Sequence, residues 1–596
     1  MGRFRDGSLS QGDLRRSYGD INARRINADD RAGHEPAAGQ YRIVGEQMTL
    51  EQKVGAMLML GWEGETPADD TTVCAKAREL VREMEVGGII LMGRNVRQDD
   101  LAVTVNTINE LQSLSREPLL VNVDQEGGMV ARFVDGVTVM PSNMALGATR
   151  RPDLAYKACY ACGEELRALG VNYDFAPCVD VNNNPDNPII GTRSYGESPD
   201  LVSGFGAQAI RGYQDAGVIA CAKHFPGHGD TAVDSHLALP SVPYPRKRLD
   251  EIELKPYRAA IAARVSSIMT THIMFPALDP DLPSTLSPNI ITGLLRGEMG
   301  YDGVIVTDSM EMKGIAANWS VPEASVMAIE AGVDIVLIPH TLSTQRESRE
   351  AIIKAVKDGR IPEPRLDQSV ARIAAVKRGY DLGNRRHADP NALGLALRTP
   401  EHLAIQRQIA ELGVTLVRNQ NGAIPLRLGA GEKALVIGTH GTVARLAAAV
   451  REHWANVDAV ELAGEREDVI GQAIAAASGA SAIIVPTCPS EPWKTATDQA
   501  LQTDVVKALN GLGKKLIVVA VREPYDLRNF AQVGAYICAY GYREGSLEAV
   551  AALIFGAIQP RGVLPVTIPL SAQEGDRCSN YTRQNGAHTA RGCGRR

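Results

Sequence analysis

Beyond residue 40, short apolar runs alternate along the chain with longer stretches whose apolar residues recur at helical spacing. Continuous apolar runs separated by helices indicate parallel strands that are covered on both faces. The runs lie at residues 54–62, 86–95, 118–128, 171–181, 218–227, 266–275, 302–312 and 332–339. Eight strand–helix units over about 340 residues predict a closed (β/α)8 barrel, with a doubly wound open sheet as the alternative.

A second α/β region follows the predicted barrel. Apolar runs at 433–439, 481–487, 514–521 and 534–541 are separated by helical patterns. They predict a smaller open sheet of parallel strands with helices on both faces, an αβα sandwich. Turn-forming residues are concentrated between the two regions, where we expect a linker. The predicted boundaries are a polar arm at 1–40, the barrel at 41–385, the linker at 386–400, the sandwich at 401–570 and a tail at 571–596.

The polar residues of the barrel runs gather toward one end of each run. An apolar stretch precedes each of Asp124, Asp180, Lys223, His224, His272 and Asp308. Because the parallel strands of a barrel point the same way, side chains at their carboxyl ends meet on one face. The pattern therefore predicts a shared polar pocket at that face.

The composition of the chain argues against two classes of binding partner, nucleic acids and membranes. The chain has 63 Lys and Arg against 70 Asp and Glu, a balance that argues against nucleic acid or an anionic membrane as the partner. Its apolar runs are shorter than the ~18 residues needed to span a bilayer. The first residues lack the apolar core of a signal peptide, so we expect a cytoplasmic location.

Cysteine usage agrees with that location. Nine cysteines show no regular spacing, which favours free thiols over a disulfide framework. Cys159 and Cys162 stand three apart in a predicted amphipathic helix, without a second pair, which argues against a redox or zinc site there. "VIGTHGT" is not a G-x-G-x-x-G motif, so the second region carries no nucleotide-binding prediction.

The stretch "KHFPGHGDTAVDSH" at 223–236 concentrates titratable groups. His224 and His228 stand four apart like zinc ligands on a helix, but the intervening Pro226 and Gly227 oppose a continuous helix. A structural interpretation has histidines satisfying loop backbone groups, and we favour it for His228. A third interpretation is acid–base catalysis, in which a carboxylate two residues away orients His236. In an extended loop the side chains at i and i+2 leave on the same side, so the Asp234 carboxylate can reach that imidazole.

This stretch resembles the signature of glycoside hydrolase family 3, in its β-N-acetylglucosaminidase branch. Four further segments resemble the family in the expected order: "VDQEGGMVARF" (123–133), "NPIIGTRSYG" (187–196), "FPALDPDLPSTLS" (275–287) and "VTDSMEM" (306–312). The segment at 539–569 resembles the family's second domain. The resemblance covers residues 45–380 strongly and 400–570 more weakly, and it implies a barrel followed by a smaller α/β domain.

The resemblance also implies roles for the matched positions. Asp308 would be the nucleophile, and His236 the general acid and base oriented by Asp234. Five residues would bind sugar hydroxyls and the N-acetyl group: Asp124, Arg132, Arg193, Lys223 and His224. No metal or cofactor is expected. Two structural alternatives remain: Asp308 could cap the next helix, and the two arginines could pair with barrel carboxylates instead of a ligand.

The expected function is a retaining exo-β-N-acetylglucosaminidase acting on short glycosides, with peptidoglycan fragments as the implied source. Because a neutral imidazole replaces a second carboxylate, phosphate could serve as acceptor, and a phosphorylase is the first alternative. A β-glucosidase or a non-catalytic sugar-binding protein is the second. Only four tryptophans are present, which favours a short substrate held by polar contacts. Glu491 and Glu544 are the acids of the second domain that could replace His236, but we expect that domain mainly to support the barrel.

Overall fold

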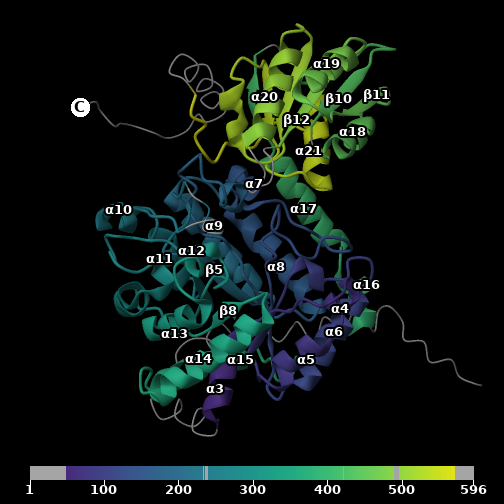
Figure 1. The fold of residues 1–596 in the computed structure, drawn as a ribbon. Coiled ribbons are helices and arrows are strands. Elements are labelled where there is room, and N and C mark those ends of the chain that lie inside the picture. Colours follow the sequence, from purple (N-terminus) through teal and green to yellow (C-terminus); the bar gives the residue numbers. More distant parts are fainter. Residues whose placement is uncertain are drawn as a thin grey trace, which may run out of the picture.

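The computed structural model describes residues 48–232, 234, 239–420, 422–439, 441–488 and 496–570. Figure 1 shows the first region, in purple to teal, below the second region, in green to yellow. The predicted polar arm and the predicted tail lie outside the described residues. No helix of the described part of the chain is both long and apolar enough to cross a membrane.

The first region is a parallel barrel. Its strands are β1 (Leu58–Leu60), β2 (Gly88–Leu91), β3 (Leu120–Val123), β4 (Tyr173–Asp174), β5 (Ile219–Phe225), β6 (Ser267–Thr270), β7 (Val304–Val306) and β8 (Val336–Ile338). They pair in the order β7-β6-β5-β4-β3-β2-β1-β8, and every pairing is parallel. A parallel bridge between Val306 and Ile335 joins the two end strands. Each predicted run contains one strand, so the barrel is confirmed and the doubly wound alternative is wrong.

Helices surround this barrel and follow the strands in turn. They are α5 (Ala75–Arg82), α6 (Leu101–Leu114), α8 (Pro152–Ala168), α9 (Pro199–Asp215), α11 (Lys255–Ala262), η4 (Asn289–Glu298), α13 (Val321–Ala331) and α14 (Leu342–Lys357). In α8 the buried residues Ala155, Cys159, Cys162 and Leu166 recur at spacings of three or four. That stripe faces the core, as expected for an amphipathic helix covering a sheet.

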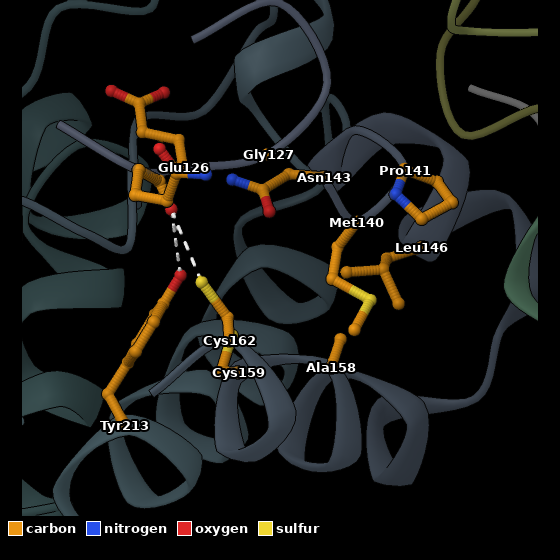
Figure 2. Close-up of a pocket in the computed structure, with 11 residues that line it drawn as sticks. Glu126, Gly127, Met140, Pro141, Asn143, Leu146, Ala158, Cys159, Cys162 and Tyr213 are labelled. Carbon is orange, nitrogen blue, oxygen red and sulfur yellow. Dashed lines mark hydrogen bonds between the residues drawn. The ribbon is translucent and has the colours of Figure 1, made fainter. Parts of the chain in front are cut away.

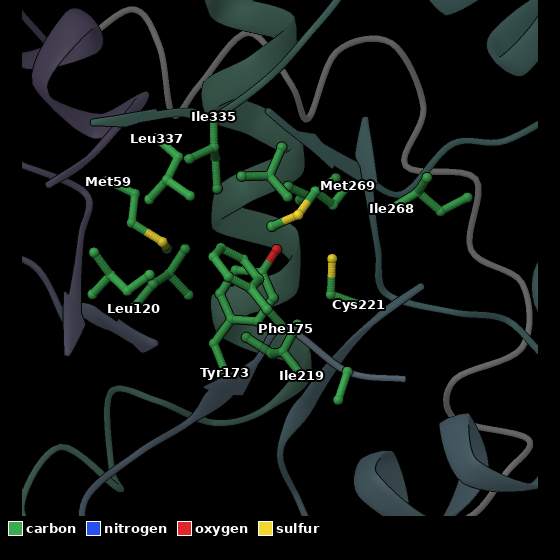
Figure 3. Packing of buried hydrophobic residues seen from close by; sticks show 14 of the residues in the cluster. Met59, Leu120, Tyr173, Phe175, Ile219, Cys221, Ile268, Met269, Ile335 and Leu337 are labelled. Atoms are coloured by element: carbon green, nitrogen blue, oxygen red, sulfur yellow. The ribbon is translucent and has the colours of Figure 1, made fainter. Parts of the chain in front are cut away.

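The barrel interior is filled by side chains that alternate along each strand. In β5, Ile219 and Cys221 lie on the same side of the strand as Lys223. Figure 3 shows Met59, Tyr173 and Leu337 directed toward one another at the centre, whereas Ile268 points away. The lower part of the barrel is therefore an apolar core, and the polar ends of the strands stand above it.

The second region is an αβα sandwich around a mixed sheet. Its strands are β9 (Thr415–Asn419), β10 (Ala434–Gly438), β11 (Val457–Glu461), β12 (Ala482–Thr487), β13 (Lys515–Ala520) and β14 (Ala535–Cys538), in the order β11-β10-β12-β13-β14-β9. Helices α18 (Val443–Arg451) and α21 (Glu544–Phe555) pack on one face of the sheet. Helices α19 (Arg466–Ala477) and α20 (Ala496–Asn510) pack on the other.

The observed sheet has two edge strands that were not predicted, and one of them is antiparallel. The four predicted runs became β10, β12, β13 and β14, which are parallel to one another. β9 adds an antiparallel edge next to β14, and β11 forms the opposite edge. In β11 only Val457 is buried, so this strand carries no apolar run that sequence inspection could find.

Helix α17 (Pro400–Gly413) joins the two regions. The predicted linker contains two short helical turns, η5 (Pro390–Ala392) and α16 (Leu393–Ala396), and α17 then packs against the barrel and α21. The imidazole of His402 contacts two barrel carboxylates, with Nδ1 2.8 Å from Glu165 and Nε2 3.2 Å from Glu164. Burial would lower the pKa of this imidazole, but the two carboxylates outweigh it and raise the pKa to about 9. A buried ion pair therefore fastens the second region to the barrel.

We expect this contact to stabilise the protein at neutral pH and to weaken at alkaline pH. The folded pKa of His402 is raised, so its stabilisation is complete below the ordinary value of 6.5 and is lost as the pH rises through about 9. His402→Gln should lower the free energy of unfolding by about 1–3 kcal/mol near pH 6.5, and by less near pH 10. Urea denaturation at both values tests this, with the exposed His453→Gln as control. An equal loss for His402→Gln at the two values would contradict it.

Candidate active site

Five of the predicted site residues stand at the carboxyl ends of the barrel strands or in the loops that follow them. Asp124 directly follows β3. Lys223 and His224 lie near the carboxyl end of strand β5. Arg193 ends the short helix η2 (Gly191–Arg193) in the loop after β4. Asp308 lies two residues beyond β7. The parallel register of the barrel thus carries all of them to one face.

Five charged groups form a continuous network at this face. The Lys223 ammonium lies 2.8 Å from Asp124 and 2.7 Å from Glu126. Arg193 donates two hydrogen bonds to the Glu126 carboxylate, at 2.9 and 2.8 Å. Arg132 donates to Asp124 at 3.1 Å. Both arginines therefore pair with barrel carboxylates, as the structural alternative expected, and they do so within the predicted polar face.

The network holds its carboxylates ionised. Burial would raise the pKa of Asp124, but Lys223 and Arg132 outweigh it and keep that pKa below its ordinary value. Burial acts the same way on Glu126, and Arg193 with Lys223 lowers its pKa to about 2. Burial would lower the pKa of Lys223, but the two carboxylates raise it. These groups are thus fixed hydrogen-bonding partners that keep their charge at neutral pH.

Glu126 and Asp180 complete the network although neither was assigned a role from the sequence. Glu126 lies two residues after Asp124 in "DQEGG", and that proximity was the available signal. Asp180 was noted only as a polar residue after an apolar run. It is fully buried and its carboxylate lies 2.7 Å from Nδ1 of His224, whose Nε2 accepts from Arg193 at 3.2 Å. Because arginine can only donate, Nδ1 of this imidazole carries the proton that Asp180 accepts.

Asp308 is half-buried beside a second histidine. Its Oδ1 accepts a hydrogen bond from the Ser309 backbone N–H at 2.7 Å. The next helix, α12 (Lys313–Ala316), has Met312 at its N-cap without a side-chain capping bond, so Asp308 does not serve as a helix cap. His272 is buried and its Nε2 donates to the Ser309 carbonyl at 2.9 Å, which fixes the loop that carries Asp308.

The described part of the stretch begins as the end of strand β5 and continues over residues 226–232 as a loop held by several hydrogen bonds. Asn187 donates to the carbonyls of His228 and Gly229, and Asp180 accepts from the His228 N–H at 2.7 Å. Gly229 packs so closely on Val181 that a Cβ would lie 1.8 Å from its carbonyl oxygen. Asp234 is buried. His236 lies outside the described residues, so its predicted pairing with Asp234 stays a prediction.

His224 and His228 are held by hydrogen bonds to other groups of the protein. His228 Nδ1 lies 2.9 Å from the Thr231 hydroxyl, and burial lowers the pKa of His228 to about 4. Cys178, Asp180 and His224 place one potential ligand atom each within 4.8 Å of one another. These atoms are joined by mutual hydrogen bonds, since Asp180 accepts from the Cys178 thiol at 3.2 Å as well as from the imidazole.

A packed layer of apolar residues lies beneath the loop after β3. Cys162 and Tyr213 both donate to the Gln125 carbonyl, at 3.9 and 3.2 Å, and Figure 2 shows the Glu126 side chain pointing away from them. The cavity between these residues has a volume of about 10 Å³, at most enough for one water molecule. Burial raises the pKa of the Cys159 and Cys162 thiols. Both cysteines are free, and they support this loop as core residues.

The second region contacts the loops that carry the charged network. Arg543 donates to the Gly128 carbonyl at 2.8 Å, and Asn182 donates to the Tyr525 hydroxyl at 2.8 Å. Asn182 also accepts from the Gly191 N–H at 3.1 Å, at the start of the turn that bears Arg193. Glu544 is exposed at the start of α21 and Glu491 lies outside the described residues.

Comparison with known proteins agrees with this architecture. Residues 49–376 match the Glycosyl hydrolase family 3 N terminal domain, which is more than half of the chain. The chain belongs to glycosyl hydrolase family 3. Residues 414–592 match the C-terminal domain of the same family. The protein is therefore a glycoside hydrolase, and the family predicted from its motifs is confirmed.

Two curated relatives and one solved structure illustrate the family 3 likeness. "Beta-hexosaminidase A" of Pseudoalteromonas piscicida is 31% identical over 87% of this chain and 97% of its own length. "Beta-N-acetylglucosaminidase/beta-glucosidase" of Cellulomonas fimi is 37% identical over 58% of this chain and 62% of its own. The structure of a family 3 β-N-acetylglucosaminidase from Paenibacillus sp. str. FPU-7 is 37% identical, with a TM-score of 0.80 over 88% of this chain and all of that one. A β-glucoside phosphorylase at 22% identity and TM-score 0.74 shows the shared fold alone.

Proposed function

We propose that this protein is a retaining exo-β-N-acetylglucosaminidase that removes terminal N-acetylglucosamine from short glycosides. Its membership in family 3 and the names of its relatives at 31–37% identity support the substrate class. The observation that carries the proposal is the buried network around Lys223, which stands at the same barrel face as Asp308. Fixed donors and acceptors of this kind suit the hydroxyls of a single sugar ring.

The proposed reaction is a double displacement. One oxygen of Asp308 attacks the anomeric carbon while the bond to the leaving oxygen breaks, and His236 gives its proton to that oxygen. In the second step His236 takes a proton from water, whose oxygen attacks the same carbon and releases Asp308. Asp234 would orient the imidazole between the two steps. Asp124, Arg132, Arg193, Lys223 and His224 would hold the sugar hydroxyls and the N-acetyl group.

We further propose that the enzyme acts in the cytoplasm on peptidoglycan fragments. All seven cysteines of the described residues carry free thiols, which is typical of a reducing compartment. The grooves that bind long polysaccharides need aromatic residues for stacking. A site that binds one terminal sugar through a charged network suits short fragments instead.

Product analysis distinguishes hydrolysis from transfer to phosphate. The imidazole proposed as acid and base brings no second negative charge to the site, which is the feature that favours an anionic acceptor. The enzyme should release N-acetylglucosamine from N,N′-diacetylchitobiose and from a muropeptide disaccharide at rates that added inorganic phosphate does not change. Dominant formation of N-acetylglucosamine 1-phosphate would reassign it as a phosphorylase. Equal or faster release of glucose from a β-glucoside would favour the β-glucosidase alternative, and no release from any substrate would favour a binding protein.

A further inference from the structure

We propose that a cavity between the ends of β1 and β8 binds the leaving group, and that it accepts an uncharged sugar through hydroxyl or amide N–H groups. The cavity has a volume of about 310 Å³. Its lining includes Trp62, Glu63, Lys76, His340, Thr341 and Gln345. This volume is at the lower end of the ~300–1,000 Å³ found for small-molecule sites. The inference rests on the proposed function, because a leaving group exists only if a glycoside is cleaved.

The barrel order places this cavity beyond Asp308 as seen from the charged network. The network stands on β3, β4 and β5, Asp308 follows β7, and the cavity lies at β8 and β1, the next strands around the barrel. The nucleophile must face the anomeric carbon, where the two halves of the substrate meet. With the terminal sugar over the network, the leaving group extends toward the cavity.

The cavity wall is bonded to the loop that carries Asp308. The carboxylate of Glu311, three residues after Asp308, accepts hydrogen bonds from the backbone N–H groups of His340 and Thr341, at 2.8 and 2.9 Å. His340 is held on its other side by Arg94, which lies 3.2 Å from Nδ1. The nucleophile loop and the cavity therefore form one connected structure.

Gln345 supplies the observation that points to a ligand. It is 1% exposed, and its Nε2 donates to the carbonyls of Gly61 and Ile338 at 2.8 Å each. These bonds determine which end of the amide is the oxygen, and that Oε1 is buried without a hydrogen-bond partner. Gln345 borders the cavity, so a sugar hydroxyl or amide N–H that reaches this atom would supply the missing donor.

The charges around the cavity favour a neutral ligand. Lys76 and Glu63 bring one charge of each sign, and the Glu311 carboxylate already takes the N–H groups at the start of α14 that could have bound an anion. Burial lowers the pKa of His340, which keeps its ring uncharged at neutral pH.

Blocking the cavity tests the proposal. Thr341→Trp places a large ring in it, and Gln345→Met removes the unpaired acceptor. Ser343→Trp is the matched control, since Ser343 is exposed on the same helical turn without lining the cavity. Each variant is compared on two substrates, N,N′-diacetylchitobiose, which has a sugar as leaving group, and N-acetyl-β-glucosaminyl fluoride, whose leaving group is one atom.

We expect Thr341→Trp to lower kcat/KM for the disaccharide by about tenfold or more relative to the fluoride, a difference worth ~1.4 kcal/mol. Gln345→Met should change the same ratio in the same direction, while Ser343→Trp leaves it at the wild-type value. Equal losses on both substrates, or an unchanged ratio in both cavity variants, would overturn the proposal. A tenfold wild-type preference for a disaccharide with a free carboxylate on its second sugar would overturn the neutral assignment. If the wild type cleaves neither substrate, the proposed function fails instead.

Discussion

Asp308→Asn should reduce kcat/KM for p-nitrophenyl N-acetyl-β-glucosaminide by at least about 10³-fold while leaving thermal stability close to the wild type. The physical reason is that an amide cannot attack the anomeric carbon, whereas its shape and its contact with the Ser309 N–H are kept. Asp308 is half-buried and does not cap a helix, so its substitution should not unfold the barrel. Initial rates and a thermal melt of the same preparation measure both effects.

A chemical rescue separates a nucleophile from a residue that merely shapes the site. With Asp308→Gly, azide should restore turnover and yield the α-glycosyl azide, because it attacks from the face that the carboxylate normally uses. A β-azide, or no rescue together with full activity of Asp308→Asn, would end the assignment.

The acid–base role is tested in parallel by His236→Ala and Glu491→Gln. We expect the first to lose activity on substrates with poor leaving groups and the second to keep it; the reverse result would move the acid to the second domain.

Lys223→Met should produce the largest loss of stability of any single substitution at the charged face, about 3–5 kcal/mol at neutral pH. Lys223 is 2% exposed and is the shared partner of Asp124 and Glu126, so its removal leaves the buried Glu126 carboxylate and the half-buried Asp124 carboxylate without their common cation. Urea denaturation at pH 7 measures the change. Lys53→Met is the control, because Lys53 is also buried but its partners Glu363 and Asp367 remain 51% and 35% exposed and keep their hydration.

The pH dependence of the same variant has a defined sign. The folded pKa values of Asp124 and Glu126 are lowered, so their contribution is present above the ordinary carboxyl range and is lost as the pH falls through the folded values. In Lys223→Met each carboxylate keeps only its arginine, Arg132 for Asp124 and Arg193 for Glu126, so protonation of the carboxylates relieves part of the lost charge pairing. The stability gap to the wild type should therefore shrink below about pH 5, and Lys223→Met/Glu126→Gln should recover part of it at pH 7. A gap independent of pH would mean that lost packing rather than lost charge is responsible.

Local pattern was sufficient for the barrel and for the face that carries its charged network. Each barrel strand is buried on both sides, so it shows as an apolar run, and each polar residue at a carboxyl end marks where that run stops. The same reasoning found β10, β12, β13 and β14. It missed β11 because an exposed edge strand keeps polar residues, and β9 because its sequence TLVRN holds only two consecutive apolar residues, too few to indicate a strand.

The partnerships within the site depended on tertiary structure. Sequence order alone could not show that Lys223 joins Asp124 to Glu126 from two strands away, or that the Asp180 carboxylate directs the proton of His224. The same holds for the cavity at β1 and β8, whose walls come from opposite ends of the barrel sequence and meet only on closure. The pattern of apolar residues along a segment shows which faces of that helix or strand are buried, and it can be read from the one segment alone. Charge pairing and cavity shape arise between elements, and these were determined only when the barrel closed and the second region packed against its loops.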